Sequence, residues 1–395
     1  MAAVSGSAFR RILFWTHLGS GIVAGILILL MSVTGVLLTY EHQIVASAEG
    51  RNRATATAGS QRLSIDELAR AARTAAGEAP RVSLVISAEA TAPVAVSTGR
   101  ETVALLNPFT GATVKDASAA PRGFFRTIED WHRWMGGDPR STRANLLDYA
   151  NLLFLFITVS GLYLWLPAVW RWRTVRGLLL FQRRYINAKV RDFNWHHVFG
   201  AWMLVPLFVI ALSGVVMSFP WANNAVYAAF GEAPPQRGGP PGAPGPQGPD
   251  GAQGRSGAAR PDGADAVASG ASLQQLFDAA AMQLPDWQRI TLPLVQRGSR
   301  VELAVDLKSE ERRPPRRTVV LDAASATVIE VRGSNVPEPT AGQKARTWFR
   351  FAHTGEQYGI VGQTLAGLAS LAACFLVYTG LALAWRRLVR PLFNR

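Results

Sequence analysis

The chain has little charge and almost no cysteine. Only 17% of its 395 residues are charged, whereas a soluble domain has about 25%, so the composition favours a membrane protein. The single cysteine, Cys374, lies within an apolar run. One thiol excludes an intramolecular disulfide, iron–sulfur ligation and a cysteine-based zinc site. If the protein carries out oxidation and reduction, a bound cofactor must therefore do so.

Several functional motifs are missing as well. The sequence has no glycine-rich nucleotide-binding loop followed by a βαβ unit, no HExxH metalloprotease motif and no nucleophile–base pair. Chemistry with NAD(P)H or flavin would therefore need another protein. The net charge of +14 does not indicate nucleic-acid binding, because most of the excess positive charge lies beside apolar runs, where it predicts membrane topology.

Four apolar runs reach the roughly 20 residues that a hydrocarbon core of about 30 Å requires. They span 12–40, 146–170, 196–221 and 360–385. The first is too long for a signal peptide and lacks a small-residue cleavage site, so we expect it to be retained. Basic residues gather before the first run, between the second and third, and after the fourth. They are Arg10, Arg11, Arg171, Arg173, Arg176, Arg183, Arg184, Lys189, Arg191, Arg386, Arg387, Arg390 and Arg395.

This charge distribution predicts a multi-pass protein of the bacterial inner membrane, with both termini in the cytoplasm. The two long connections then face outward, into the periplasm of a Gram-negative cell. The predicted parts are the N-terminus with transmembrane helix 1 (1–41), a first outer module with the segment before the next span (42–140), transmembrane helix 2 (141–170), a basic loop (171–195), transmembrane helix 3 (196–221), a second outer module (222–350), transmembrane helix 4 (351–385) and a tail (386–395).

The two outer connections have similar patterns. Ser64 and Glu67 form a capping box that opens a helix in the first, and Ser272 precedes a helix-like stretch in the second. Alternating apolar segments and one probable hairpin follow in each, at 103–114 and 319–328. The predicted fold is therefore an all-α membrane core of four transmembrane helices in two parallel repeats, with two small α+β modules. A Pro/Gly-rich tract at 231–270 is expected to be disordered.

All six histidines lie at or near the ends of the spans. His17 precedes Gly35 by eighteen residues, and His196 precedes Gly214 by eighteen, so the first and third spans match. The second and fourth match more loosely. His132 and His353 stand 29 and 27 residues before glycines that follow a serine or a threonine. Those pairs are Ser160-Gly161 and Thr379-Gly380.

Two halves with one orientation would be related by a pseudo-twofold axis along the membrane normal. His17 would then face His196 near the cytoplasmic side, and His132 would face His353 near the outer side. Opposed imidazoles in a helix bundle suit two b-type haems, which need no cysteine. The alternative is that these are ordinary interfacial histidines. A non-haem metal is less favoured, because few carboxylates lie nearby. The repeat leaves His42 and His197 unpaired. His42 could compete as a ligand of the outer haem, and His197 could contact a haem propionate or a lipid headgroup.

The chain resembles the PepSY-associated transmembrane family, also called iron-regulated membrane proteins. The likeness is carried by Trp131-His132-Arg133, Asn194-Trp195-His196, His353-Thr-Gly-Glu356 and Leu106-Asn-Pro-Phe-Thr-Gly111. The second module departs from the pattern, since Ala323-Ala-Ser-Ala326 stands where a turn glycine is expected. His197 also stands where relatives commonly have arginine.

The resemblance implies a di-haem ferric reductase that takes electrons from quinol or a cytoplasmic flavoprotein. A ferric siderophore, or another iron chelate outside the membrane, would receive them. Two alternatives remain open. The outer modules could bind a ligand or regulate a peptidase without redox activity, or the protein could deliver electrons to a separate periplasmic enzyme.

Overall fold

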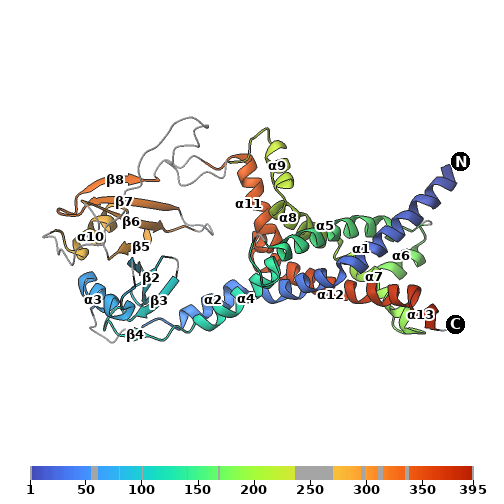
Figure 1. The fold of residues 1–395 in the computed structure, drawn as a ribbon, viewed down its shortest axis with the longest axis horizontal. Helices are drawn as coiled ribbons and strands as arrows, with labels where there is room; N and C mark the ends of the chain where they lie inside the picture. The colour runs from blue at the N-terminus through green and yellow to red at the C-terminus, as the bar shows by residue number, and fades with distance from the viewer. Residues whose placement is uncertain are drawn as a thin grey trace. The chain divides into compact units, whose positions relative to one another are not determined.

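The computed structural model describes residues 2–54, 61–79, 81–99, 101–139, 141–167, 170–235, 270–294, 299–309, 315–333 and 338–393. Most of the Pro/Gly-rich tract, for which the sequence predicts disorder, lies outside these described ranges. The chain divides into two compact units (Figure 1). We call them the helical unit (Met1–Gln43, Arg122–Arg237 and Pro339–Arg395) and the sheet unit (Ile44–Pro121 and Gly238–Glu338).

Three helical segments of the described residues are long and apolar enough to cross a membrane. They contain α1 (Ala2–Leu38), α5 (Thr142–Trp165) and α12 (Gly359–Leu388). A fourth is formed by α7 (Ala188–Trp202) and α8 (Leu204–Ser218) if this bent pair counts as one span. The helical unit therefore has three or four candidate transmembrane segments at the places where the apolar runs predict them.

Two of these segments differ from the predicted ones. The run 196–221 is not one straight helix, because α7 and α8 meet at an angle of 69°. Pro206 explains the break, since it has no N–H for a bond to the carbonyl of Trp202 and its ring crowds that carbonyl. The second helix ends at Trp165, five residues before the predicted end. Pro167 disfavours helical geometry at the residue before it.

Shorter helices complete the helical unit and its connections. They are α2 (Glu41–Gly50), α4 (Ala119–Trp134), α6 (Trp172–Leu179), α9 (Pro220–Ala228), α11 (Ala341–His353), the 3-10 helix η1 (Glu356–Tyr358) and α13 (Arg390–Phe393). The repeat is visible in this order, because α4 precedes α5 as α11 precedes α12. α1 packs against α5 and α12, and α12 also packs against α7. Buried alanines at these contacts, such as Ala24, Ala150 and Ala373, let the helix backbones approach closely.

The sheet unit contains one antiparallel sheet of eight strands in the order β4-β3-β2-β1-β5-β6-β7-β8. The strands are β1 (Val82–Ser87), β2 (Val94–Thr98), β3 (Glu101–Leu106), β4 (Thr113–Val114), β5 (Trp287–Pro293), β6 (Arg300–Leu307), β7 (Arg316–Asp322) and β8 (Val328–Arg332). The two predicted modules are therefore halves of one sheet, joined where β1 pairs with β5 in the register Leu84↔Leu292. Burial alternates along β1, so one face of the sheet forms the core.

Two helices cover that face (Figure 1). They are α3 (Ile65–Ala76) and α10 (Leu273–Gln283), and their leucines join one core with both halves of the sheet. Ser64 caps α3 in the capping box that the sequence predicts, and hydrogen bonds from the Ser64 side chain and backbone lower the pKa of Glu67. Each helix also caps the other. Asp66 accepts the N–H of Leu273, and the Gln274 side chain accepts the N–H of Ile65.

Both predicted hairpins are present, as β3–β4 and β7–β8. In the second turn, the Oδ1 of Asp322 accepts N–H groups from Ser325 and Ala324, and these bonds lower the pKa of Asp322. Gly111 ends the first turn with φ +69°, and Ala326 has φ +56° at the corresponding place in the second. The left-handed conformation that glycine adopts freely is thus imposed on an alanine here.

Candidate functional site

The four histidines that the repeat matches share one hydrogen-bonding arrangement. In each, Nδ1 lies within hydrogen-bonding distance of the hydroxyl of a serine or threonine on another helix of the same half. The pairs are His17 with Ser160 (2.9 Å), His132 with Thr34 (2.8 Å), His196 with Thr379 (3.0 Å) and His353 with Ser213 (3.0 Å). We call these four the anchor hydroxyls. A glycine follows every one of them in the sequence.

The anchor hydroxyls determine which ring nitrogen carries the proton. Each hydroxyl donates its hydrogen to a carbonyl of its own helix, three or four residues earlier. The shortest such bonds are 2.7 Å, from Thr34 to Leu30 and from Thr379 to Phe375. With that hydrogen committed, the hydroxyl oxygen accepts from Nδ1–H of the histidine. Nε2 then keeps its lone pair, as a metal ligand requires.

The protonation of Nδ1 follows most directly from the contacts of His353. Its Nδ1 lies 3.0 Å from the carbonyl oxygen of Ile210 as well as 3.0 Å from the Ser213 hydroxyl. A carbonyl oxygen can only accept a hydrogen bond, so Nδ1 must be the donor. Ser213 itself donates to the same Ile210 carbonyl at 2.9 Å. One helical turn of α8 therefore holds the ring from two sides.

The rings of His132 and His353, near the ends of α4 and α11, lie close together in an edge-to-face arrangement. Their ring centres are 6.2 Å apart, and the ring planes cross at 67°. A metal held between two imidazole nitrogens lies about 2.0 to 2.1 Å from each, which places the two ring centres about 6 Å apart. Burial, reinforced by the nearby His353, lowers the pKa of His132 to about 4. The ring is therefore neutral near pH 7 and available as a ligand.

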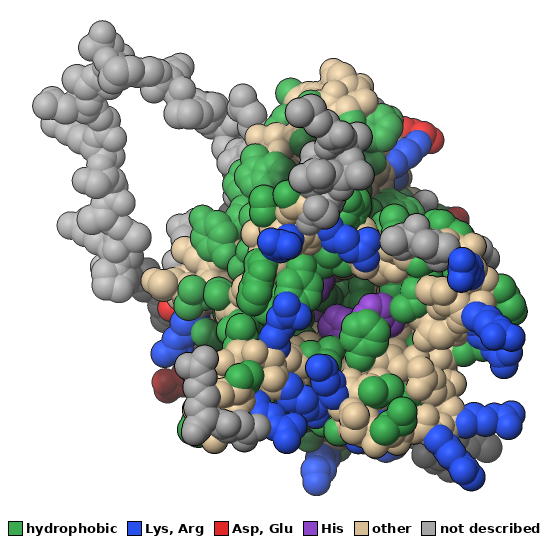
Figure 2. Space-filling model, turned by 90° about the vertical axis from the view of Figure 1, so that its right-hand side faces the viewer, with side chains coloured by type: hydrophobic (Ala, Val, Ile, Leu, Met, Phe, Trp, Pro, Cys, Tyr) green, Lys and Arg blue, Asp and Glu red, His purple; other side chains and the backbone are tan. Residues whose placement is uncertain are grey.

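The other two matched histidines, His17 and His196, line one cavity of about 1020 Å³. That volume is at the upper end of the range of about 300–1,000 Å³ found for ligand pockets. Figure 2 shows histidine side chains inside a hollow, between apolar and basic side chains. The walls come from α1, α5, α7, α8 and α12, and five glycines flatten them. These are Gly21, Gly25, Gly161, Gly200 and Gly380.

Basic side chains also line this cavity. They are Arg10, Arg11, Lys189, Arg386 and Arg387. Such groups bind carboxylates strongly, so a flat group with acidic substituents, such as haem with its propionates, matches both the apolar walls and the basic lining. The outer pair, His132 and His353, does not line this cavity.

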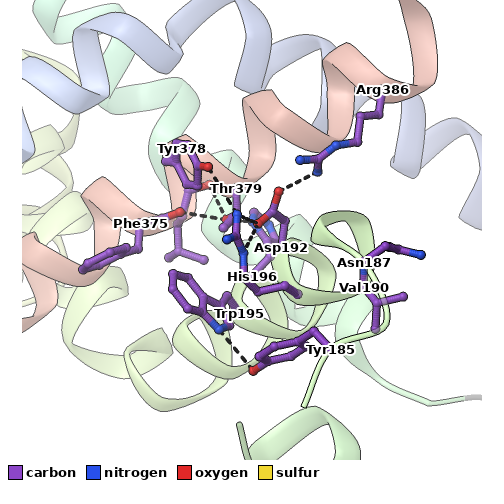
Figure 3. A network of polar contacts seen from close by, with 12 residues as sticks. Tyr185, Asn187, Val190, Asp192, Trp195, His196, Phe375, Tyr378, Thr379 and Arg386 are labelled. Atoms are coloured by element: carbon purple, nitrogen blue, oxygen red, sulfur yellow. Dashed lines mark hydrogen bonds and ion pairs between the residues drawn. The ribbon is translucent and has the colours of Figure 1, made fainter. Parts of the chain in front are cut away.

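A buried ion-pair network holds the helix that carries His196 (Figure 3). Asp192 lies one turn before His196 on α7, and its side chain has no exposed surface. Its carboxylate accepts hydrogen bonds from Arg191 (3.0 Å) and from Arg386 on α12 (2.5 Å). Since α12 also carries the Thr379 hydroxyl, the network fixes the two helices that meet at His196.

The two unpaired histidines are placed differently. His197 lines the inner cavity, and its Nδ1 lies 2.8 Å from the Phe193 carbonyl of its own helix. Its ring lies against the Phe193 ring, with 4.1 Å between the centres. His42 is exposed on α2. Neither has an anchor hydroxyl among the contacts of the described residues.

No group of three or more histidine, cysteine, aspartate or glutamate side chains in the described part of the chain is placed to hold a metal ion. Paired histidines suit a metal that brings further ligands with it, as haem iron does with its porphyrin nitrogens. Sequence reasoning missed the anchor hydroxyls. Their signal was the repeated Ser-Gly or Thr-Gly pair, which aligned the two halves but was not connected to the histidines.

These features define a class: a membrane protein whose helical unit carries two pairs of histidines and whose second unit is a helix-covered β-sheet. The family model described as the PepSY-associated TM region matches residues 14–387, nearly the whole chain, and the chain belongs to this family. The resemblance found from sequence motifs is thereby confirmed. A search of curated proteins found no match to the chain.

Proposed function

We propose that this protein is a di-haem b electron-transfer protein of the bacterial inner membrane, acting as a ferric reductase on an iron chelate outside that membrane. One observation carries the proposal. Four histidines in matched positions each place Nδ1 within 3.0 Å of a hydroxyl on a neighbouring helix, an arrangement that leaves Nε2 for a ligand when Nδ1 carries the proton. Structural histidines have no need to share one tautomer and one anchoring pattern four times.

His17 and His196 would hold one haem, and His132 and His353 the other. When bound, haem supplies a centre that accepts and gives one electron at a time. The chain's own residues would supply the ligand nitrogens, and at the inner cavity apolar walls and basic groups for carboxylates. The 6.2 Å between the outer rings supports a metal between them.

The separation of the two sites supports transfer across a bilayer. Thr34, which anchors His132, lies seventeen positions after His17, and Ser213, which anchors His353, lies seventeen positions after His196. At a rise of about 1.5 Å per residue, seventeen residues of α1 extend about 25 Å. That is close to the hydrocarbon thickness of about 30 Å.

The continuous sheet supports the predicted topology. Because β1 and β5 pair in one sheet, the chain between them must cross the membrane an even number of times. That stretch contains α5 and the bent pair α7–α8, so the pair counts as one crossing. Both chain ends then lie on one side, and we assign that side to the cytoplasm from its arginines.

Electrons would enter at the His17/His196 side, from quinol or a cytoplasmic flavoprotein, and leave from the His132/His353 side. The acceptor would be a ferric siderophore or a similar chelate. One electron converts its Fe(III) to Fe(II), which oxygen ligands hold less tightly, so the iron is released as the product.

The test is a haem-to-protein ratio and an absorbance spectrum for the purified full chain and three variants. We expect two low-spin haems in the wild type, about one in His17→Ala and about one in His132→Ala. His42→Ala, which lies outside both pairs, is the matched control and should keep two. A colourless wild type after expression with ample haem would refute electron transfer and favour a ligand-binding or peptidase-regulating role.

The acceptor needs its own measurement. The chemically reduced protein is mixed with a ferric hydroxamate chelate, while haem absorbance and Fe(II) captured by a ferrous chelator are followed together. Reoxidation of the haem with stoichiometric Fe(II) supports a ferric reductase. A di-haem protein that stays reduced would instead fit delivery of electrons to a separate enzyme.

A further inference from the structure

We propose that the four anchor hydroxyls are positioning residues, which set the tautomer and the ring plane of each histidine before a metal group binds. This inference rests on the proposed haem binding and adds residues that do not touch the metal. A hydrogen bond to the second ring nitrogen fixes the orientation of a ligating imidazole and its basicity.

Ordinary helix chemistry does not explain these contacts. Ser32 and Thr158 also donate their hydroxyls to carbonyls of their own helices, at 2.7 and 2.9 Å. Valine follows each of them, whereas glycine follows every anchor hydroxyl. A serine or threonine in a span can therefore satisfy itself without a histidine. Each of the four that bond a histidine is followed by glycine, although Ser20 also precedes a glycine.

Three of the four glycines lie directly beside a histidine ring. A Cβ added at Gly161 would lie 3.3 Å from Cε1 of His17, and one added at Gly380 would lie 3.5 Å from Cε1 of His196. The corresponding distance from Gly35 to Cε1 of His132 is 3.7 Å. A hydroxyl followed by glycine thus places an acceptor for Nδ1 next to a residue that leaves the ring edge uncrowded, and only at Gly161 would an added Cβ lie closer to the ring than ordinary contact. In the fourth pair, Gly214 admits the Asn151 side chain instead.

In the outer pair, the two anchors hold the rings at a defined angle to each other. Thr34 on α1 holds His132 and Ser213 on α8 holds His353, and the two ring planes cross at 67°. Crossed axial imidazole planes give ferric low-spin haem a strongly anisotropic electron paramagnetic resonance signal, whereas parallel planes give a rhombic one. The outer site should therefore show the strongly anisotropic signal, and that signal should depend on the two anchors.

The test compares Thr34→Val, which keeps the side-chain shape but removes the acceptor, with Thr34→Ser, which restores it. Ser32→Ala, on the same helix and the same kind of carbonyl bond, is the matched control. Haem is titrated into the apoprotein, and the ferric resonance spectrum is recorded. We expect Thr34→Val to weaken the outer haem by about 10- to 100-fold and to change its signal, while the inner haem is unaffected.

Thr34→Ser and Ser32→Ala should behave as the wild type does. Ser213→Ala acts on the partner ring and keeps the test decisive if Thr34→Val does not fold. A di-haem wild type whose outer affinity and signal are unchanged by both substitutions overturns this inference alone. Equal loss in Thr34→Val and Thr34→Ser also overturns it, because side-chain shape would then be the cause. A wild type without haem overturns both this inference and the proposed function.

Discussion

The buried carboxylate of Asp192 offers the sharpest test of how the inner site is held. Replacing it by asparagine keeps the shape and removes the charge that two arginines share. The Asp192 side chain has no exposed surface, while the side chains of Arg386 and Arg191 are 21% and 35% exposed. Removing one partner of a buried ion pair costs about 3–5 kcal/mol. Both arginines retain some water, so we expect the lower end, about 3 kcal/mol.

The assay is reversible unfolding of the full chain in mixed micelles, followed by circular dichroism. A loss of about 3 kcal/mol raises the unfolding constant by roughly 150-fold. Because Asp192 lies one turn before His196, we also expect weaker haem binding at the inner site and no change at the outer one. Glu129→Gln is the control. It breaks an ion pair whose side chains are 55% and 44% exposed, which should cost less than about 1 kcal/mol.

A double variant decides whether the reasoning is right. Asp192→Asn leaves Arg386 without its carboxylate, so Arg386→Gln added to it should recover part of the stability. An Asp192→Asn variant within about 0.5 kcal/mol of the wild type would mean that the network carries no more energy than a surface pair. A double variant that loses the full sum of both single losses would show that the two side chains act independently.

Three further outcomes follow from the geometry. Gly161→Ala places a Cβ 3.3 Å from His17 Cε1, so the inner haem should be depleted in the haem-to-protein ratio and the outer one kept; equal loss of both would contradict this. Ala326→Gly removes the strain of an alanine in the left-handed conformation. It should raise the opening free energy of β7 and β8, measured by hydrogen exchange, by up to about 1 kcal/mol. The pKa of Glu67 and that of Asp322 are lowered in the folded sheet unit. Their contribution to stability is therefore present above the unfolded-state pKa of about 4 and is lost as the pH falls below it, which melting curves at descending pH would detect. A sheet unit that is no less stable at pH 3 than at pH 6 would contradict this last expectation.

The membrane segments could be predicted because length and apolarity alone identify them. The same criterion does not detect a bend. The break at Met203 was therefore not predicted, although Pro206 is present in the sequence. The hairpins were predictable for a similar reason, since a turn motif such as 107–111 is local.

The joining of the two modules was not predictable in the same way. β1 and β5 are distant in the sequence, and nothing in either strand identifies its partner before the chain is folded. The histidine pairs followed from repeat spacing, which is a global pattern. The anchor hydroxyls did not, because a bond such as that between His132 and Thr34 depends on how two helices pack. A serine or threonine in a span also has its own helix carbonyl as an adequate partner.

The junction between β1 and β5 has a consequence for biosynthesis. Ser87 ends β1 and Trp287 begins β5, so a ribosome that adds about 5–20 residues per second needs roughly 10 to 40 s to supply the partner strand. Throughout that time the edge of a strand rich in β-branched residues remains open to other chains. The delay also includes the synthesis of α5 and the α7–α8 pair, candidate membrane segments that lie between the two strands. Assembly of the sheet therefore waits for these helices to be made, and a chain that stalls before β5 leaves the edge of β1 unpaired.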